Sequence, residues 1–255
     1  MSSRPPEFDE NLSALAADLP PMGDLDGLYR ELEGQVRREQ GPRAWLRERS
    51  TPVRGTIALG TITALTVAVW LSWARPDLGS YPGWHMALTL GAIGAVLVCA
   101  LAIGLRPLHM PEAPAWLSRL VLGGGLVLLF AVYMLPAGAH AATHGDGLPG
   151  VLHGAWKCFG TGAVLGLPVY VLLRLLDRGS SPYGVATALA AGLSANLLLQ
   201  LHCPNSAPQH MVLGHLTVAF VFGLVYVAYR RVASIYRVPS CRLLTGLLDG
   251  RTRLP

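Results

Sequence analysis

The sequence predicts an all-α polytopic membrane protein with six transmembrane helices and a short helical cytoplasmic N-terminal extension. The composition is the first reason: 52% of the 255 residues are hydrophobic and only 14% are charged, whereas soluble domains carry about 25% charged residues. The second is that apolar runs recur, each long enough to cross a bilayer of about 30 Å as a helix. The third is that the basic residues gather in alternate connections between these runs.

Six apolar runs are predicted to be helices, because only a helix satisfies its own backbone groups within lipid at this length. Tryptophans near the run ends, including Trp73 and Trp84, fit anchors at the membrane surface. The predicted spans are 53–74, 84–105, 116–136, 152–174, 183–202 and 209–229. The chain then divides into a cytoplasmic amphipathic segment at 1–52, a transmembrane domain at 53–230 and a basic tail at 231–255.

The basic residues predict the orientation. If the N-terminus lies inside, all but two of the 20 lysines and arginines fall on the inner side, and the exceptions are Arg75 and Lys157. A bias of this strength predicts a protein of the bacterial inner membrane with both termini in the cytoplasm. The net charge of +5 therefore indicates contact with membrane lipids and no direct contact with nucleic acid.

The N-terminal extension carries two apolar stripes at helical spacing. Short amphipathic helices of this kind suit a partner that offers a groove. The alternative is a solubilising tail without a partner. The residues predicted to bind a partner are Phe8, Leu12, Leu15, Leu19, Leu25, Leu28, Leu32 and Val36.

Two cysteines are predicted to reach the same depth of the membrane. Cys158 lies near the start of the fourth span and Cys203 at the end of the fifth. Counted from the loop that joins these spans, they lie about 16 and about 20 residues away, or roughly 24 and 30 Å of helix. The thiols can then pair or share a ligand if the helices touch, and Lys157 is placed to lower the pKa of Cys158. The alternative is two small buried residues.

The stretch from Asn196 to His215 holds most of the polar residues near this depth. Asn196, Gln200 and Cys203 share one helix face, either as a link between helices or as a support for the thiol. His202, Cys203, His210 and Cys158 offer ligands that suit zinc or copper. They predict a transient metal site and no permanent cofactor; the alternative is solvated histidines at the membrane surface. His210 and His215 stand five apart, which does not place them on one α-helix face.

Enzyme signatures are missing from the sequence. It contains no phosphate-binding loop and no GxSxG, and the six predicted span cores lack Asp and Glu. These observations predict that the protein is not an enzyme. They also argue against a transporter, which needs ionisable groups within its spans.

The segment Ala190-Ala-Gly-Leu-Ser-Ala-Asn-Leu-Leu-Leu-Gln-Leu-His-Cys-Pro204, followed by His210, resembles the NrsF family of six-span membrane anti-sigma factors. Cys158 within Trp-Lys-Cys-Phe and the Leu167-Pro168 pair strengthen the resemblance. It implies that the protein holds an extracytoplasmic-function sigma factor and releases it on an oxidative, metal or photo-oxidative signal. The implied sensor is Cys158 with Cys203, supported by His202, His210, Pro204, Asn196, Gln200 and Lys157. The alternative is a six-span transporter of small molecules or metals, or a metal-binding redox protein.

Overall fold

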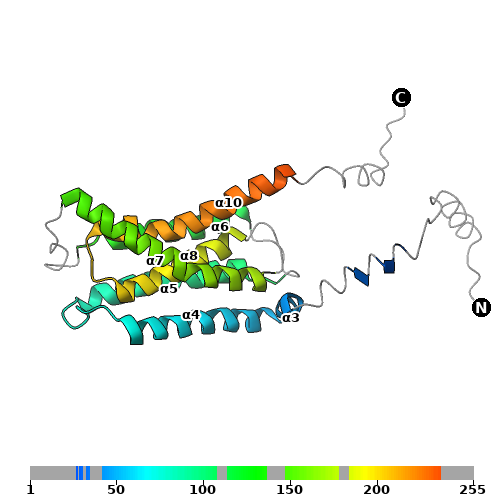
Figure 1. Ribbon diagram of the computed structural model, residues 1–255, viewed down its shortest axis with the longest axis horizontal. Coiled ribbons are helices and arrows are strands. Elements are labelled where there is room, and N and C mark those ends of the chain that lie inside the picture. Colours follow the sequence, from blue (N-terminus) through cyan, green and yellow to red (C-terminus); the bar gives the residue numbers. More distant parts are fainter. Residues whose placement is uncertain are drawn as a thin grey trace, which may run out of the picture. The chain divides into compact units, whose positions relative to one another are not determined.

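Figure 1 shows the computed structural model, which describes residues 27, 29, 30, 33, 34, 42–107, 114–136, 147–177 and 184–236. The chain divides into two units, Met1–Trp45 and Leu46–Pro255. The eight residues predicted to bind a partner lie outside the described residues, so their role stays a prediction; they are Phe8, Leu12, Leu15, Leu19, Leu25, Leu28, Leu32 and Val36.

Every regular element among the described residues is a helix, which confirms the predicted all-α class. Six helical spans within these residues are long and apolar enough to cross a membrane, as the sequence predicts. The sixth span is continuous but changes its winding, because a π-helix separates two α-helical parts. The elements are α3 (Pro42–Glu48), α4 (Thr51–Trp73), α5 (Gly83–Gly104), α6 (Ala115–Met134), α7 (Gly147–Leu176), α8 (Gly184–His202), α9 (Pro208–His210), the π-helix η3 (Met211–Leu216) and α10 (Thr217–Tyr236).

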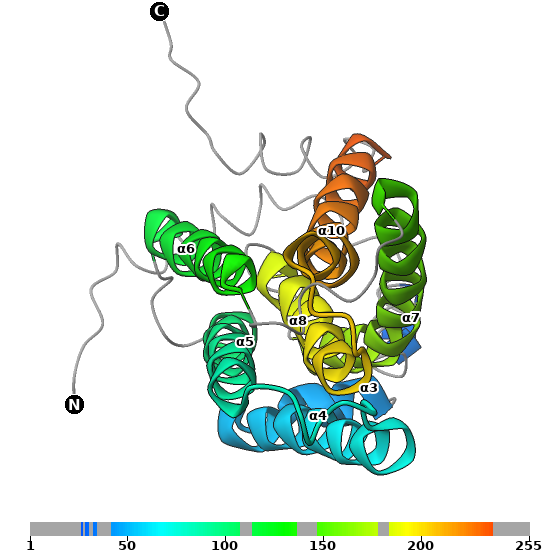
Figure 2. The ribbon, with the colours of Figure 1, turned by 90° about the vertical axis from the view of Figure 1, so that its left-hand side faces the viewer.

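Helix α8 is the centre of the bundle formed by α4 to α10. Figure 2 shows it between α5, α7 and α10, and 83% of its span is buried by protein. Its sequence is rich in alanine, and the glycine at position 192 allows a close approach. A Cβ on Gly192 would lie 2.5 Å from the Cα of Ala219 in α10. Small residues are what lets membrane helices pack backbone to backbone.

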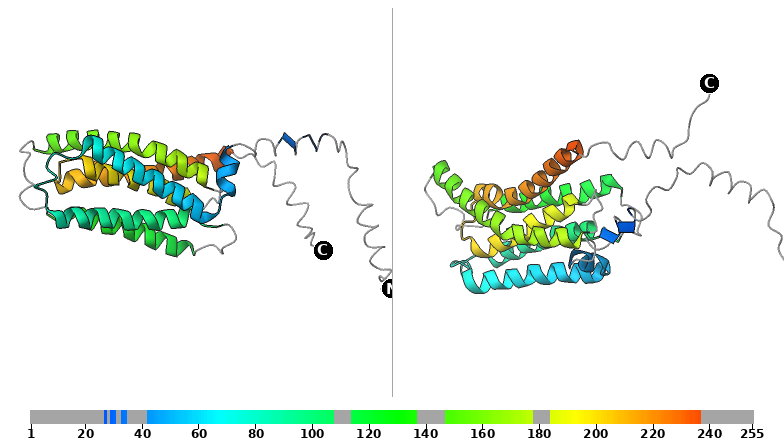
Figure 3. Two further views of the ribbon diagram at one scale, coloured as in Figure 1. Left: turned by 90° about the horizontal axis from the view of Figure 1, so that it is seen from below. Right: turned by 45° about the vertical axis from the view of Figure 1, so that its right-hand side comes forward.

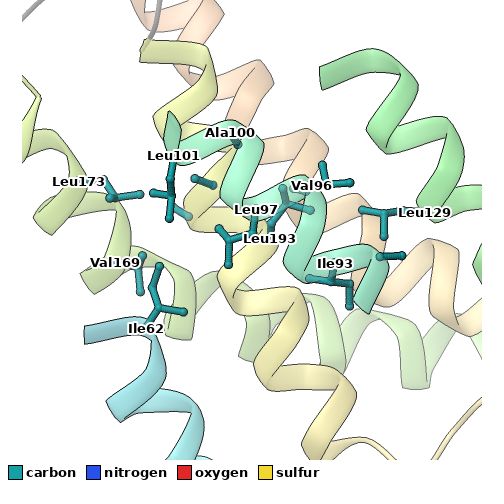
Figure 4. Packing of buried hydrophobic residues seen from close by; sticks show 14 of the residues in the cluster. Ile62, Ile93, Val96, Leu97, Ala100, Leu101, Leu129, Val169, Leu173 and Leu193 are labelled. Atoms are coloured by element: carbon teal, nitrogen blue, oxygen red, sulfur yellow. The ribbon is translucent and has the colours of Figure 1, made fainter. Parts of the chain in front are cut away.

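Around α8, mainly aliphatic side chains from α4, α5, α6, α7, η3 and α10 form the core. Figure 4 shows Ile62 of α4, Leu97 of α5 and Leu173 of α7 near Leu193 of α8, and all four are buried. Lipid chains are as apolar as these side chains, so the association of the helices depends on close van der Waals packing rather than on escape from water.

A buried arginine ties three helices at one end of the bundle, called the Arg54 end below. Arg54 is 1% exposed. It donates hydrogen bonds to the carbonyls of Leu176 (2.8 Å) and Leu105 (3.0 Å) and to the Thr51 hydroxyl (3.0 Å). The two carbonyls belong to the C-terminal ends of α7 and α5, where backbone acceptors lack partners within the helix and a positive charge is favourable.

Replacing Arg54 by methionine is expected to lower the free energy of unfolding by about 2–4 kcal/mol, because two buried carbonyls each lose a charged donor. Arg54→Lys keeps the charge but not the forked geometry, so its loss is expected to be smaller. Thermal unfolding of the detergent-solubilised protein measures both. Equal stability of the methionine variant and the wild type would show that Arg54 does not hold these helix ends.

The opposite end of the bundle, called the Cys203 end below, carries the α4–α5 and α8–α9 connections (Figures 1 and 3). The two connections are bonded to each other, since the Arg75 backbone N–H donates to the Leu201 carbonyl at 2.9 Å. Exposed tryptophans, among them Trp73 and Trp84, lie at the helix ends here, as the sequence predicts for residues at a membrane surface.

Candidate metal centre

Cys158 and Cys203 meet at the Cys203 end. Cys158 lies in α7, and Cys203 follows α8, whose hydrogen-bonding pattern it continues through a bond from its N–H to the Leu199 carbonyl. The Cys158 thiol donates to the Cys203 sulfur, and the two sulfurs are 3.4 Å apart. Both are free thiols; Cys203 is buried and Cys158 is half-buried. The equal depth that the span lengths predict is therefore observed.

Two histidines join the cysteines. His210 Nε2 lies 3.3 Å from the Cys203 sulfur, and the His210 and His215 rings contact edge to face with centroids 5.4 Å apart. One ligand atom from each of Cys158, Cys203, His210 and His215 lies within 4.8 Å of the others. We call these four residues the Cys2His2 cluster. It is assembled from α7, the α8–α9 connection and the α9–η3 segment.

The π-helix η3 explains why His215 joins the cluster. The Thr217 N–H donates to the Val212 carbonyl five residues earlier, which is the hydrogen bond that defines π winding. In this winding, residues five apart lie on one face, whereas in an α-helix they do not. The prediction that separates His210 from His215 is therefore wrong. π-turns occur frequently at functional sites.

Gly214 lets α7 approach the segment that carries the histidines. A Cβ on Gly214 would lie 3.1 Å from the Cα of Ala155 and 3.3 Å from the Cβ of Cys158. A Cβ on Gly154 would lie 3.5 Å from His210 Nδ1, which is an ordinary van der Waals distance. Any side chain at position 214 thus presses on the backbone of α7, so glycine there sets the distance between Cys158 and η3.

Several polar atoms of the cluster make no hydrogen bond of good geometry within the part of the chain that the structure describes. They are both ring nitrogens of the fully buried His215 and the buried His210 Nδ1. A buried polar group without a partner costs about 1–3 kcal/mol. A bound ion would satisfy one nitrogen of His215, and His210 already directs its Nε2 toward the Cys203 sulfur.

Cys203 is favoured as a thiolate. The hydrogen bond that it accepts from the Cys158 thiol, together with the His210 imidazole, lowers the pKa of Cys203 below its usual range, although burial acts in the opposite direction. The thiolate is the form that binds metals.

His202 and Lys157 do not belong to the cluster. His202, the last residue of α8, is exposed, and its Nδ1 donates to the Trp73 carbonyl of α4 at 2.9 Å. Of the four predicted ligands, the structure brings together Cys158, Cys203 and His210, and His215 joins them where His202 does not. Lys157 is exposed, and no contact between its ammonium and Cys158 exists among the described residues. Neighbouring side chains diverge on a helix.

Asn196 and Gln200 face away from the cluster and join helices. Asn196 Oδ1 accepts a hydrogen bond from the Tyr133 hydroxyl of α6 at 2.8 Å. The Gln200 amide lies 4.0 Å from the Met86 sulfur of α5. Cys203 instead faces Cys158 of α7. The three residues therefore contact different neighbours, and the structure favours the interpretation of both amides as links between helices.

Arg75 is a residue that the sequence analysis uses only for topology. It is 3% exposed, makes a two-bonded ion pair with Asp77 (both 2.7 Å) and stacks on the Tyr81 ring. Its guanidinium also donates to the Pro204 carbonyl at 3.2 Å and to the Ser206 hydroxyl at 3.1 Å. Arg75 thereby fixes the connection that carries Cys203. Only its isolated position in a short loop distinguishes it in the sequence.

Comparison with known proteins gives one similarity to report. No profile of a known protein family matches the chain, and no solved structure matches it. The phospho-N-acetylmuramoyl-pentapeptide-transferase of Corynebacterium urealyticum is 25% identical over an alignment of 254 positions, which covers 75% of this chain and 67% of that protein. The resemblance to the NrsF family stays a prediction.

This similarity contradicts two functional predictions, the anti-sigma function and the absence of enzymatic activity, because the relative is named as a transferase. Both predictions were wrong because of the sequence features on which they were based. Six spans and a His-Cys-Pro motif describe a scaffold and a thiol, and a scaffold serves many functions. Short motifs of soluble enzymes do not test for a membrane enzyme, whose site is assembled from residues on several helices.

Proposed function

We propose that this chain is a metal-binding integral membrane protein whose Cys2His2 cluster holds one transition-metal ion. The observation that carries the proposal is the convergence of four ligand atoms within 4.8 Å, one of them from the fully buried His215, whose ring nitrogens make no hydrogen bond of good geometry among the described residues. Two thiolates and two imidazoles are the donor set of tetrahedral zinc sites.

The distances support a tetrahedral ion. With metal–sulfur and metal–nitrogen bonds of about 2.3 and 2.0 Å, the ligand atoms of such a site stand about 3.3–3.8 Å apart. The two sulfurs are 3.4 Å apart, and the Cys203 sulfur is 3.3 Å from His210 Nε2. These two distances lie within a few tenths of an ångström of those of a tetrahedral site, and the remaining ligand atoms lie within 4.8 Å of one another.

The role of the ion depends on which segments of the chain its ligands come from. All four positions would be filled by protein, and closed sites of this kind hold structure together rather than activate a substrate. The ion would bridge α7, the α8–α9 connection and η3. The arginine and lysine bias supports placing this end of the bundle outside the cytoplasm of an inner membrane, where metal ions arrive from the exterior.

Cobalt substitution tests the proposal. The reduced, chelator-treated protein is titrated with Co2+, and we expect one ion per chain with intense visible bands and thiolate-to-cobalt charge transfer in the near ultraviolet. Cys203→Ala is expected to remove both features. Cys99→Ala is the control, because Cys99 is an exposed cysteine of α5 outside the cluster. Identical spectra for the wild type and Cys203→Ala would rule out the cluster as the site.

Transfer of phospho-N-acetylmuramoyl-pentapeptide is a second candidate function, favoured by the similarity to the transferase that bears this name. Its test is independent of metal binding. The purified protein is incubated with a labelled donor of this group and a membrane extract, and the label that is transferred to components of the extract is counted. We expect transfer above a heat-denatured sample; no transfer beside an active reference transferase would exclude the activity.

A further inference from the structure

The charge of the Cys2His2 cluster points to the kind of ion that it takes. Two thiolates carry a charge of −2, and neutral imidazoles add none. Among the described residues, no Asp or Glu carboxylate lies within this group of ligand atoms. The buried Arg75 nearby is matched by its ion pair with Asp77. An ion of charge +2 therefore makes the site neutral, and an ion of charge +1 leaves it negative.

Burial makes this difference in charge important. Three of the four ligands, Cys203, His210 and His215, are buried, and Cys158 is half-buried. An uncompensated charge in such surroundings is strongly unfavourable, and the free energy of binding must cover it. The site should therefore favour an ion whose charge makes the bound site neutral over an ion that leaves a net charge.

The spacing of the two sulfurs also favours a divalent ion over a monovalent one. An ion that prefers two opposed thiolates requires sulfurs about 4.6 Å apart at a bond length of about 2.3 Å. The sulfurs of Cys158 and Cys203 are 3.4 Å apart, and two imidazoles complete a four-coordinate set. Tetrahedral sites with two sulfurs and two nitrogens are typical of zinc.

Building on the proposed metal centre, we infer that the site takes a divalent, tetrahedrally coordinated ion of the zinc group in preference to a monovalent ion such as Cu+. Ligand softness alone gives the opposite order, because thiolates are soft ligands that favour Cu+. Selection by charge and selection by ligand softness make opposite predictions for the bound Cu+/Zn2+ ratio when one thiolate is lost.

The test is a competition between Zn2+ and Cu+ on the full chain, reduced and stripped of metal under argon. Equimolar ions are supplied, and the bound metals are counted by elemental mass spectrometry. Zinc is expected to be the main metal of the wild type. Cys158→His keeps four ligands but only one thiolate, so a monovalent ion now gives neutrality, and the bound Cu+/Zn2+ ratio is expected to rise at least tenfold.

Each other outcome is decisive. Copper as the main metal of the wild type, or an unchanged or lower ratio in Cys158→His, would overturn the selection by charge and leave the metal centre intact. A wild type that binds neither ion would overturn the proposed function itself. If Cys158→His does not purify as a folded protein, Cys158→Ala is judged by the same ratio, because it also leaves one thiolate. Cys99→Ala is the matched control and is expected to behave as the wild type.

Discussion

Zinc is expected to raise the free energy of unfolding of the wild-type protein by about 4 kcal/mol when free zinc exceeds its dissociation constant a thousandfold. The reason is that only the folded chain brings ligands from α7, the α8–α9 connection and η3 together. Thermal unfolding of the reduced protein in detergent, with zinc and with a chelator, measures the difference. This is the largest effect that the cluster predicts.

The His215→Ala variant tests whether zinc stabilises the protein by binding to the Cys2His2 cluster. It removes the fully buried imidazole but keeps both thiols, so general binding of zinc to cysteine is unchanged. We expect the stabilisation by zinc to fall to a small fraction of the wild-type value, while Cys99→Ala retains all of it. Equal stabilisation of His215→Ala and the wild type would show that zinc acts elsewhere on the chain.

Replacing Gly192 by alanine is expected to destabilise the protein by about 3 kcal/mol, at the upper end of the usual cost of overpacking. The added Cβ would lie 2.5 Å from the Cα of Ala219. Because that contact is with backbone, α8 and α10 must move apart, and no side chain can yield instead.

Gly160→Ala is the matched control for Gly192→Ala. Gly160 lies in α7, is exposed, and has nothing within 4 Å of an added Cβ. Alanine there is expected to stabilise the helix by up to about 1 kcal/mol. The two substitutions should therefore shift the midpoint of thermal unfolding in opposite directions. A Gly192→Ala variant as stable as the control would show that α8 and α10 do not need this close approach.

The spans were predictable because their signal is local and strong. A run of apolar residues near 20 long has few structures open to it in lipid, so the predicted spans 84–105 and 183–202 match α5 and α8 within one residue at each end. The equal depth of Cys158 and Cys203 was predictable as well, since depth along an antiparallel hairpin depends only on the rise per residue.

The rest of the site depends on details that no local pattern carries. His215 enters the cluster only through π winding, in which a backbone hydrogen bond joins residues five apart instead of four. The sequence Met-Val-Leu-Gly-His-Leu contains no pattern that predicts this winding. Arg75 acts through tertiary contacts with Asp77, Tyr81 and Ser206, which a charge count cannot reveal. His202 faces α4 rather than the cluster because its position in the last turn of α8 directs it there.

The π-helix has an effect beyond the histidines. Compared with regular α winding, η3 accommodates an extra residue, and one residue corresponds to a rotation of about 100° around the helix axis. All of α10 is therefore turned relative to α9 by this amount. The rotation decides which side of α10 meets the bundle: Ala219 rests on Gly192, and Phe222 contacts Tyr170 of α7. A chain shortened by one residue within η3 would turn these side chains toward lipid, so the six-residue segment sets the phase of the whole last span.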